Sequence, residues 1–369
     1  MRSITAAVVH ERGGPFRLET LELAEPGPDE LVVRVVACGI CQTDVHARDD
    51  YFGIPYPCVF GHEGAGIVEQ VGARVAKVAP GDPVVMVSPS CGACPACLRK
   101  LPGYCYSSRR IKMGGLLRDG RTPMRQHGHA VRGAFFQQSS FATHALATEA
   151  NVVKVPPGMP LEQAAAFPCG VNTGAGAVFN VLRPAPASTF AVFGAGTVGL
   201  AGLMAARIAG CTTLIAVDLH ERRLALAREL GATHTVDARS ANVVAEVRDA
   251  TGGAGVDCSL EAAGEPRALR HAVDSLGALG VCCLVGSARK GTEAALEMVQ
   301  IQHGRTLRGC VQGDAPPDEF IPRLFEHFRA GTMPVQRLIT SYEFGDINRA
   351  VEDLLGGRTV KAVLRITAH

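Results

Sequence analysis

A glycine-rich turn limits what this chain can fold into more than any other stretch of its sequence. An apolar run ends at Phe193, the pattern G-x-G-x-x-G occupies Gly194–Gly199, and a helical apolar pattern follows over Val198–Ala209. In such a strand–turn–helix unit the first glycine allows the tight bend, the second lets the backbone approach a pyrophosphate, and the third lets helix and strand pack closely. The candidate cofactor-binding residues of the turn are Gly194, Gly196, Thr197, Val198 and Gly199.

An acidic residue follows at the distance that such a unit requires. Asp218 ends the next apolar run, 19 residues after Gly199. A carboxylate there accepts a hydrogen bond from a ribose 2′-hydroxyl and repels a 2′-phosphate, which favours NAD over NADP. Arg222 and Arg223 nearby weaken that preference. Because the chain has 42 glycines, the competing interpretation is a set of turn glycines without a ligand, and the strand, helix and acid around the turn argue against it.

The order of the apolar runs predicts two kinds of domain. From about Leu161, short strand-like runs alternate with helical patterns, which predicts a parallel, doubly wound sheet. Before that point, short β-rich runs broken by Gly and Pro suggest a small barrel or sandwich. The predicted strands are Thr5–Val9, Leu31–Val36, Ala65–Val71, Pro83–Val87, Ser139–Ala147, Phe190–Phe193, Leu214–Val217, Val256–Leu260, Val281–Val285, Leu307–Val311 and Ala362–Ile366. The predicted helices are Val198–Ala209, Glu221–Leu230, Val243–Asp249, Pro266–Ser275, Glu293–His303, Glu319–Ala330 and Ile347–Leu355.

Length and composition exclude several classes of function. A chain of 369 residues with 47% apolar and 20% charged residues is expected to form a globular protein of two domains. A net charge of +2 without a stripe of Lys and Arg argues against a nucleic-acid partner. No apolar run approaches about 18 residues, which argues against a membrane span, and no signal peptide is evident at the start. Thirteen cysteines in such a chain indicate a reducing compartment, the cytoplasm, and metal ligands rather than disulfides.

Four of the cysteines form the array C-x2-C-x2-C-x7-C over residues 91–105. Four thiolates so close together can close a tetrahedral zinc site that has no open position and therefore no chemistry of its own. An iron–sulfur cluster is the competing interpretation, because ferredoxin-like arrays use related spacings. Four clustered free thiols on a loop would be an oxidation liability, so we expect a metal. The candidate ligands are Cys91, Cys94, Cys97 and Cys105.

A second group of candidate ligands is spread along the chain. Cys41 lies in the polar stretch 39–46 after a predicted strand, His62 lies in Phe60-Gly61-His62-Glu63, and Cys169 lies where the β-rich part meets the α/β part. Two cysteines and one histidine with a water form a catalytic zinc set. Each of the three alone is equally compatible with a structural role, so the interpretation rests on their combination. The remaining cysteines are embedded in apolar runs and are expected in the core: Cys38, Cys58, Cys211, Cys258, Cys282, Cys283 and Cys310.

Polar residues around Cys41 and His62 suggest proton transfer and support of a metal ligand. Thr43 could pass the proton of an alcohol outward, and His46 could carry it to solvent. Asp44 could accept a hydrogen bond from the second nitrogen of His62 and so fix its tautomer, and Glu63 is a further carboxylate beside a ligand. Taken singly, each of these four is equally compatible with an ordinary loop residue.

Together these motifs resemble the zinc-containing alcohol dehydrogenases of the medium-chain dehydrogenase/reductase superfamily. Gly61-His62-Glu63-x2-Gly66-x5-Gly72-x2-Val75 is similar to the family signature. The Gly-Ile-Cys-Gln-Thr-Asp stretch, the four-cysteine lobe, Cys169-Gly170, the dinucleotide turn and Thr359-Val360-Lys361 agree in order over nearly the whole chain. Residues 133–143 and 306–309 look most like bacterial aryl-alcohol (benzyl alcohol) dehydrogenases.

The resemblance implies a GroES-like catalytic domain over residues 1–170 and 318–369, interrupted by a Rossmann NAD-binding domain over residues 171–317. It implies two zinc ions per chain, and a dimer with a tetramer left open. In relatives a basic or His residue often follows the first cysteine ligand, but Gln42 stands here, so Lys361 is expected to contact the pyrophosphate instead. The implied roles are catalytic zinc ligands for Cys41, His62 and Cys169, structural ligands for the four-cysteine array, a proton relay for Thr43 and His46, outer carboxylates for Asp44 and Glu63, a nicotinamide neighbour for Thr173 and a ribose neighbour for Arg223.

The expected activity is oxidation of a primary, aromatic alcohol to its aldehyde, with hydride transfer to NAD. A dehydrogenase of the glutathione adduct of formaldehyde, S-(hydroxymethyl)glutathione, uses the same core motifs and stays open. A non-catalytic dinucleotide-binding structural protein also stays open, although the complete set of catalytic ligands argues against it.

Overall fold

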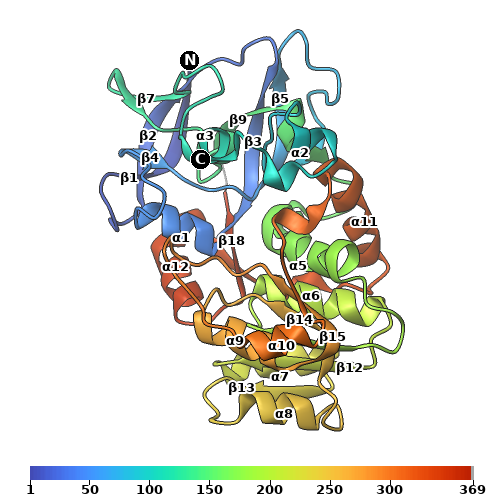
Figure 1. Cartoon of the computed structure of the whole chain (residues 1–369). Helices are drawn as coiled ribbons and strands as arrows, with labels where there is room; N and C mark the ends of the chain where they lie inside the picture. The colour runs from blue at the N-terminus through green and yellow to red at the C-terminus, as the bar shows by residue number, and fades with distance from the viewer. Residues whose placement is uncertain (367–369) are drawn as a thin grey trace. The chain divides into compact units, whose positions relative to one another are not determined.

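The computed structural model describes residues 1–366 and divides them into two compact units (Figure 1). The first unit contains Met1–Cys169, Pro316–Phe325 and the chain from Gln336 onward, and the second contains Gly170–Ala315 and Glu326–Val335. The predicted combination of a β-rich part and a doubly wound α/β part is confirmed. The predicted domain limits, 1–170 with 318–369 and 171–317, stay predictions.

The first unit is built from two mostly antiparallel sheets whose facing residues form one apolar core. One sheet has the strand order β4-β1-β2-β7-β8, and the other has the order β10-β6-β5-β3-β18-β17 with β9 also paired to β3. The strands are β1 (Arg2–Val9), β2 (Arg17–Leu23), β3 (Glu30–Gly39), β4 (Cys58–Val59), β5 (Gly64–Val71), β6 (Pro83–Met86), β7 (Met124–Gln126), β8 (His129–Val131), β9 (His144–Thr148), β10 (Val152–Lys154), β17 (Ile339–Glu343) and β18 (Lys361–Arg365). The helices are α1 (Gln42–Arg48), α2 (Pro95–Leu98), α3 (Ser108–Met113), α4 (Leu161–Ala164), α12 (Ile347–Leu355) and the first part of α11 (Pro317–Arg329).

The second unit contains a six-stranded parallel sheet with the order β13-β12-β11-β14-β15-β16. After β11, the chain adds β12 and β13 toward one edge of the sheet. It then returns to the other side of β11 and adds β14, β15 and β16 toward the opposite edge, so the strand order reverses between β11 and β14. Helix α6 packs on β11, β12 and β14, and helix α9 packs on β11, β14 and β15. The elements are α5 (Asn172–Gly176), β11 (Thr189–Phe193), α6 (Thr197–Ile208), β12 (Thr213–Asp218), α7 (Glu221–Glu229), β13 (His234–Asp237), α8 (Val243–Asp249), β14 (Val256–Glu261), α9 (Pro266–Asp274), β15 (Leu276–Leu284), α10 (Met298–Gln302) and β16 (Thr306–Gly309).

The polar stretch after β3 forms the short helix α1, an element that was not predicted. Two local predictions were wrong. The strand expected over Ser139–Ala147 begins only at His144, and Ser139 at its predicted start has a positive φ angle that a strand does not accommodate. The helix expected over Glu293–His303 is confined to Met298–Gln302. The seven cysteines expected in the core are all buried there.

No helix among residues 1–366 is long and apolar enough to cross a membrane.

Candidate metal centres and catalytic site

The end of β3 presents Cys41 at the start of helix α1. Strand pairing aligns Val363 of β18 with Gly39, and Cys38 with Gly64 of β5, so three distant segments meet at this point. Gly39 is required there, because a Cβ atom would lie 2.1 Å from the Glu63 carboxylate. Cys41 occupies the N-cap position of α1, and its backbone N–H donates to Asp44 Oδ2 at 3.0 Å. The first turn of the helix therefore fixes the direction of the Cys41 side chain.

Cys41, His62, Glu63 and Cys169 converge in the first unit. One ligand atom from each of the four lies within 4.8 Å of the others. The sulfurs of Cys41 and Cys169 are 4.0 Å apart, and a hydrogen bond between them lowers the pKa of Cys41 and raises that of Cys169. Cys169 lies in a π-helical turn, Phe167–Val171, a local widening of the helix that is common at functional sites. The structure thus brings together the three residues predicted to bind the catalytic zinc.

The hydrogen bonds of Asp44 prepare His62 to bind a metal. Asp44 is fully buried and its carboxylate accepts from the Gly61 amide at 3.1 Å, the Cys41 amide at 3.0 Å and His62 Nδ1 at 2.9 Å. A neutral imidazole that donates from Nδ1 carries its lone pair on Nε2. His62 Nε2 is buried without a hydrogen-bond partner among the described residues. An orphaned lone pair beside two cysteine sulfurs is the donor set of an open zinc site.

The donor distances also suit zinc. A Zn–S bond of about 2.3 Å in a tetrahedral site places two sulfurs about 3.8 Å apart. The 4.0 Å separation of the Cys41 and Cys169 sulfurs agrees with that value and is too long for a disulfide.

Glu63 lies closer to the candidate ligands than an outer carboxylate needs to be. One of its oxygens belongs to the four-atom cluster, Oε2 is paired with the Lys361 ammonium, and Oε1 is buried without a hydrogen-bond partner within residues 1–366. Lys361 is also buried, and its ammonium donates to the Ile40 carbonyl at 3.2 Å. Lys361 is thus part of the site, while its contact with a pyrophosphate stays a prediction.

Thr43 and His46 lie three residues apart on α1, a spacing that places both side chains on one face of the helix. The imidazole of His46 stacks on the Tyr51 ring, with centroids 4.2 Å apart and planes 2° from parallel. Gln42 is exposed on the same helix, and no hydrogen bond of its side chain is seen among residues 1–366. The relay through Thr43 and His46 stays a prediction, and so does the lack of a basic contact at Gln42.

Sequence reasoning missed the segment that holds His62 in place. Phe136 stacks on the His62 imidazole at 4.6 Å, and the Gln138 side chain donates to the His62 carbonyl at 3.1 Å and accepts from the Gly64 amide at 3.2 Å. Lys112 lies beyond Phe136, with its ammonium 6.0 Å from the ring centroid, and burial lowers the pKa of Lys112 to about 8. The signal for this segment was the run Gln137-Gln138-Ser139-Ser140, four polar residues that are all buried.

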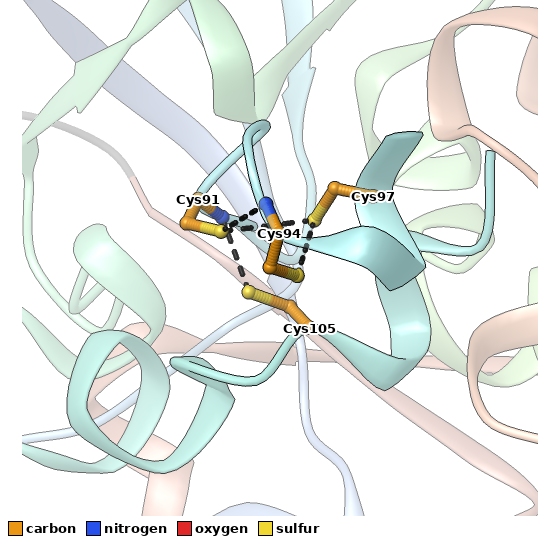
Figure 2. Close-up of side chains that lie close together, drawn as sticks. All are labelled: Cys91, Cys94, Cys97 and Cys105. Carbon is orange, nitrogen blue, oxygen red and sulfur yellow. Dashed lines mark hydrogen bonds between the residues drawn. The ribbon is translucent and has the colours of Figure 1, made fainter. Parts of the chain in front are cut away.

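The four cysteines of the 91–105 lobe point toward one another (Figure 2). Their sulfurs lie within 4.8 Å of each other, with 3.5 Å between Cys94 and Cys97 and 3.9 Å between Cys91 and Cys97. Backbone amides of Tyr106 and Cys97 lower the pKa of Cys94 to about 6, which favours the thiolate. These separations fit one zinc ion, whereas an iron–sulfur cluster needs room for several metal atoms and sulfides.

The glycines of the dinucleotide turn have the geometry that the motif requires. Gly194 has φ +100°, and a Cβ atom there would lie 2.9 Å from the Ala263 amide at the adjacent strand end. A Cβ atom on Gly196 would meet no atom of residues 1–366 within 4 Å, so the backbone there is open to a ligand. A Cβ atom on Gly199 would lie 1.9 Å from the Gly194 carbonyl, which shows how closely α6 packs on the turn. The turn lies at the switch point between β11 and β14, where doubly wound sheets bind nucleotides.

The remaining predicted cofactor residues are distributed around this turn in the second unit. Asp218 ends β12, and its carboxylate accepts from the Ala195 amide at 2.7 Å and the His220 amide at 2.9 Å. Arg223 Nη1 lies 3.8 Å from Asp218 Oδ2, and Arg223 Nε is buried without a hydrogen-bond partner among the described residues. Thr197 and Val198 begin α6, and Thr173 lies on α5. The residues therefore fit a dinucleotide, and the roles of the individual side chains stay predictions.

Comparison with known proteins identifies the family. Residues 27–157 match the model of the alcohol dehydrogenase GroES-like domain, and residues 197–328 match that of the zinc-binding dehydrogenase domain. The chain belongs to the zinc-containing alcohol dehydrogenases of the medium-chain dehydrogenase/reductase superfamily. The dehydrogenase therefore has the predicted GroES-like and Rossmann folds.

Three relatives are similar over the whole length. The dehydrogenase is 40% identical to geraniol dehydrogenase from Castellaniella defragrans over 365 residues, which cover 98% of this chain and 97% of the relative. The structure of an alcohol dehydrogenase zinc-binding domain protein from Burkholderia ambifaria is 45% identical, with a TM-score of 0.97 and complete coverage of both chains. The structure of benzyl alcohol dehydrogenase from Acinetobacter calcoaceticus is 39% identical, with a TM-score of 0.95 and complete coverage of both chains.

Proposed function

We propose that this dehydrogenase oxidises a primary alcohol whose carbinol carbon is attached to an aromatic or alkenyl carbon, with NAD as the hydride acceptor. The observation that carries the proposal is the convergence of Cys41, Cys169 and the lone pair of His62 Nε2 in one cluster. The names of two relatives support the substrate class, because benzyl alcohol and geraniol are both primary alcohols next to an sp² carbon. Of these two substrates, benzyl alcohol is favoured by residues 133–143 and 306–309, because those segments look most like bacterial aryl-alcohol dehydrogenases.

Cys41, His62 and Cys169 would hold a catalytic zinc ion, and the 91–105 lobe would hold a second, structural one. A catalytic zinc ion supplies Lewis acidity, which makes a neighbouring alcohol hydroxyl more acidic. Around it, Asp44 keeps the His62 imidazole in the required tautomer, and Phe136 covers one face of that ring. The protein therefore contributes ligand side chains that are already oriented before the reaction, so that they need not reorient while it proceeds.

The proton of the alcohol would leave by way of α1. Thr43 is half-buried and would accept the hydroxyl proton while it donates its own onward. His46 lies on the same helix face and would carry that proton to solvent, with Tyr51 fixing the plane of its imidazole. This arrangement separates proton removal from hydride transfer, and hydride acceptance belongs to the nicotinamide cofactor.

The proposal of NAD rests on Asp218. Its carboxylate is fixed by two backbone amides at the end of β12, where it would accept a hydrogen bond from a ribose 2′-hydroxyl. Arg223 stands 3.8 Å away and is the residue that would favour NADP. Measuring kcat/KM with both cofactors tests the choice, and a preference for NADP would overturn it.

A panel of alcohols tests the activity. Zinc-loaded protein is mixed with NAD and benzyl alcohol, geraniol, cyclohexanol or ethanol, and NADH is followed by absorbance. We expect the highest kcat/KM with benzyl alcohol or geraniol. The variant Cys169→Ser should abolish turnover, whereas the matched variant Cys211→Ser, at a buried cysteine of the second unit, should retain it. Absence of NADH formation with every alcohol would refute the proposal.

S-(hydroxymethyl)glutathione belongs in the same panel, because a dehydrogenase for this adduct would use the same donor set. A kcat/KM for the adduct above that for benzyl alcohol and geraniol would replace the proposed substrate class.

A homodimer is the proposed assembly. Strand β16 is the edge of the parallel sheet and is exposed along its whole length, so its backbone can pair with another strand. Large apolar side chains are exposed on and around this edge, which suits a second copy of the chain. These side chains are Leu279, Met298, Val299, Ile301, Leu307 and Val311. Light scattering coupled to size exclusion tests the state, and the variant Leu307→Lys should shift a dimer toward monomer.

A further inference from the structure

A cavity of about 450 Å³ in the first unit has no role in the chemistry described above. One wall is formed by residues 52–55, after α1, and the other by residues 106–114, which include α3. Its volume lies in the range of small-molecule sites, about 300–1,000 Å³. Phe52, Tyr106 and Met113 provide apolar surface, and Arg109 and Arg110 provide two guanidinium groups.

Neither guanidinium group has an acidic partner in the part of the chain that the structure describes. Arg109 Nη2 donates to the Phe52 carbonyl at 3.4 Å, and Arg110 Nη1 donates to the Arg118 carbonyl at 3.5 Å. Neither arginine forms an ion pair with any residue in 1–366. Each guanidinium carries five N–H donors, so most of these donors have no partner within residues 1–366. Two guanidinium groups with such N–H donors at one cavity are suited to bind an anion.

The charge of the surrounding segment supports an anionic ligand. Residues 91–132 contain nine Lys and Arg and a single acid, Asp119, whose carboxylate is already bonded to Arg121. The net side-chain charge of this segment is therefore +8, although the whole chain has only +2. Four thiolates with one zinc ion would contribute −2, which still leaves +6. A positive potential of this kind attracts anions from solution.

Both walls of the cavity belong to segments that also supply residues around the catalytic cluster. Phe52 follows Tyr51, whose ring stacks on His46. On the other side, Lys112 of α3 lies over Phe136, and Phe136 stacks on His62. Phe52 and Met113 of the cavity walls are thus direct sequence neighbours of Tyr51, which stacks on the candidate relay residue His46, and of Lys112, which lies over the ring that stacks on His62.

We propose that this cavity binds the carboxylate end of an aryl alcohol substrate, with Arg109 and Arg110 as its partners. Carboxylates are the planar anions that guanidinium groups bind with paired hydrogen bonds, and the apolar side chains accept the aryl carbon skeleton. A bare inorganic anion would leave these apolar walls unused. The inference rests on the proposed alcohol oxidation and adds a substrate class to it: alcohols with a negatively charged far end, such as hydroxymethylbenzoates.

Kinetics with matched substrates test the cavity. The selectivity ratio is kcat/KM for 3- or 4-(hydroxymethyl)benzoate divided by kcat/KM for benzyl alcohol. Replacing both arginines in the variant Arg109→Gln/Arg110→Gln should lower this ratio about tenfold for at least one isomer, mainly through KM, as expected for two partly exposed charge pairs. The matched control Arg125→Gln removes a guanidinium from the same basic segment outside the cavity, where Arg125 donates to the Gly128 carbonyl, and should leave the ratio within about twofold. An unchanged ratio in the double variant overturns the inference.

Direct binding separates this inference from the proposed activity. Calorimetry with 4-(hydroxymethyl)benzoate and with benzoate is carried out on the zinc-loaded protein without cofactor. Binding that weakens about tenfold in the double variant and not in Arg125→Gln supports the cavity even if no alcohol is oxidised, in which case only the proposed function fails. Equal binding by all three proteins overturns the inference. Competition by inorganic phosphate as strong as that by benzoate also overturns it, because the site would then bind anions without regard to the aryl group.

Discussion

The substitution Asp44→Asn tests how far the catalytic zinc depends on a residue that does not touch it. Asp44 is fully buried and accepts three hydrogen bonds, from His62 Nδ1, the Gly61 amide and the Cys41 amide. An asparagine has nearly the same shape and can accept at one oxygen only. The variant therefore changes charge and hydrogen bonding while it preserves packing.

The expected loss follows from these three contacts. His62 and Gly61 both donate to Oδ1, so an asparagine oxygen placed there keeps two bonds as neutral ones. The Cys41 amide donates to Oδ2, and the asparagine amide group in that place would oppose it donor to donor. A hydrogen bond to a charged group is worth about 1.5–3 kcal/mol and a neutral one about 1 kcal/mol, so the total loss is about 3–5 kcal/mol, divided between folding and zinc binding. Loss of such a carboxylate lowers metal affinity about 10- to 100-fold.

Chelator competition measures this loss. Protein with bound zinc is titrated with a chromogenic chelator, and the release of one zinc ion per chain is compared between Asp44→Asn and the parent. We expect one zinc ion to leave at a 10- to 100-fold lower chelator concentration, while the second, in the 91–105 lobe, is unaffected. Asp82→Asn is the control, because Asp82 also accepts from a backbone amide, that of Ala79, away from the cluster. An Asp44→Asn protein that releases both ions like the parent would refute the role assigned to Asp44.

Three further predictions concern other parts of the structure. Gly199→Ala places a Cβ atom 1.9 Å from the Gly194 carbonyl, so calorimetry should find NAD binding at least tenfold weaker, and unchanged affinity would contradict the packing of α6 on the turn. Cys105→Ser should remove the structural zinc and lower Tm by several degrees while the catalytic zinc stays, and metal analysis that still finds two ions per chain would count against the lobe as a metal site. Lys361→Met leaves the buried Glu63 carboxylate without its partner and should reduce the free energy of unfolding by about 3–5 kcal/mol in denaturant titration. Adding Glu63→Gln should restore much of this loss, and a double variant as unstable as the single one would show that the pair is not what stabilises this site.

Most of the fold was predictable because its elements repeat simple patterns. The parallel strands are short apolar runs, and α8 and α12 were predicted with the bounds that the structure gives them. The two clusters of candidate metal ligands were predictable because their ligand types are rare and Cys91–Cys105 are close in sequence. The triad of Cys41, His62 and Cys169 could be proposed only from the combination of its ligand types, since no spacing joins residues that are 128 positions apart, and the family resemblance then supported it.

What failed depends on contacts that no local pattern records. Helix α1 forms because Asp44 caps it through the Cys41 amide, although Gly39–His46 has the composition of a loop. The positive φ angles of residues 136, 137 and 139 are held by buried side chains such as Ser139, which donates to the Val59 carbonyl. Lys361 is an isolated lysine in the sequence, and only the pairing of β18 with β3 brings it to Glu63.

Anomalous diffraction at the zinc absorption edge from crystals of the purified protein tests the central claim most directly. Two peaks per chain are predicted, one among the sulfurs of Cys91, Cys94, Cys97 and Cys105 and one bounded by Cys41, His62 and Cys169. A zinc-replete crystal with a peak in the four-cysteine lobe and none between Cys41, His62 and Cys169 would contradict the assignment of the catalytic centre.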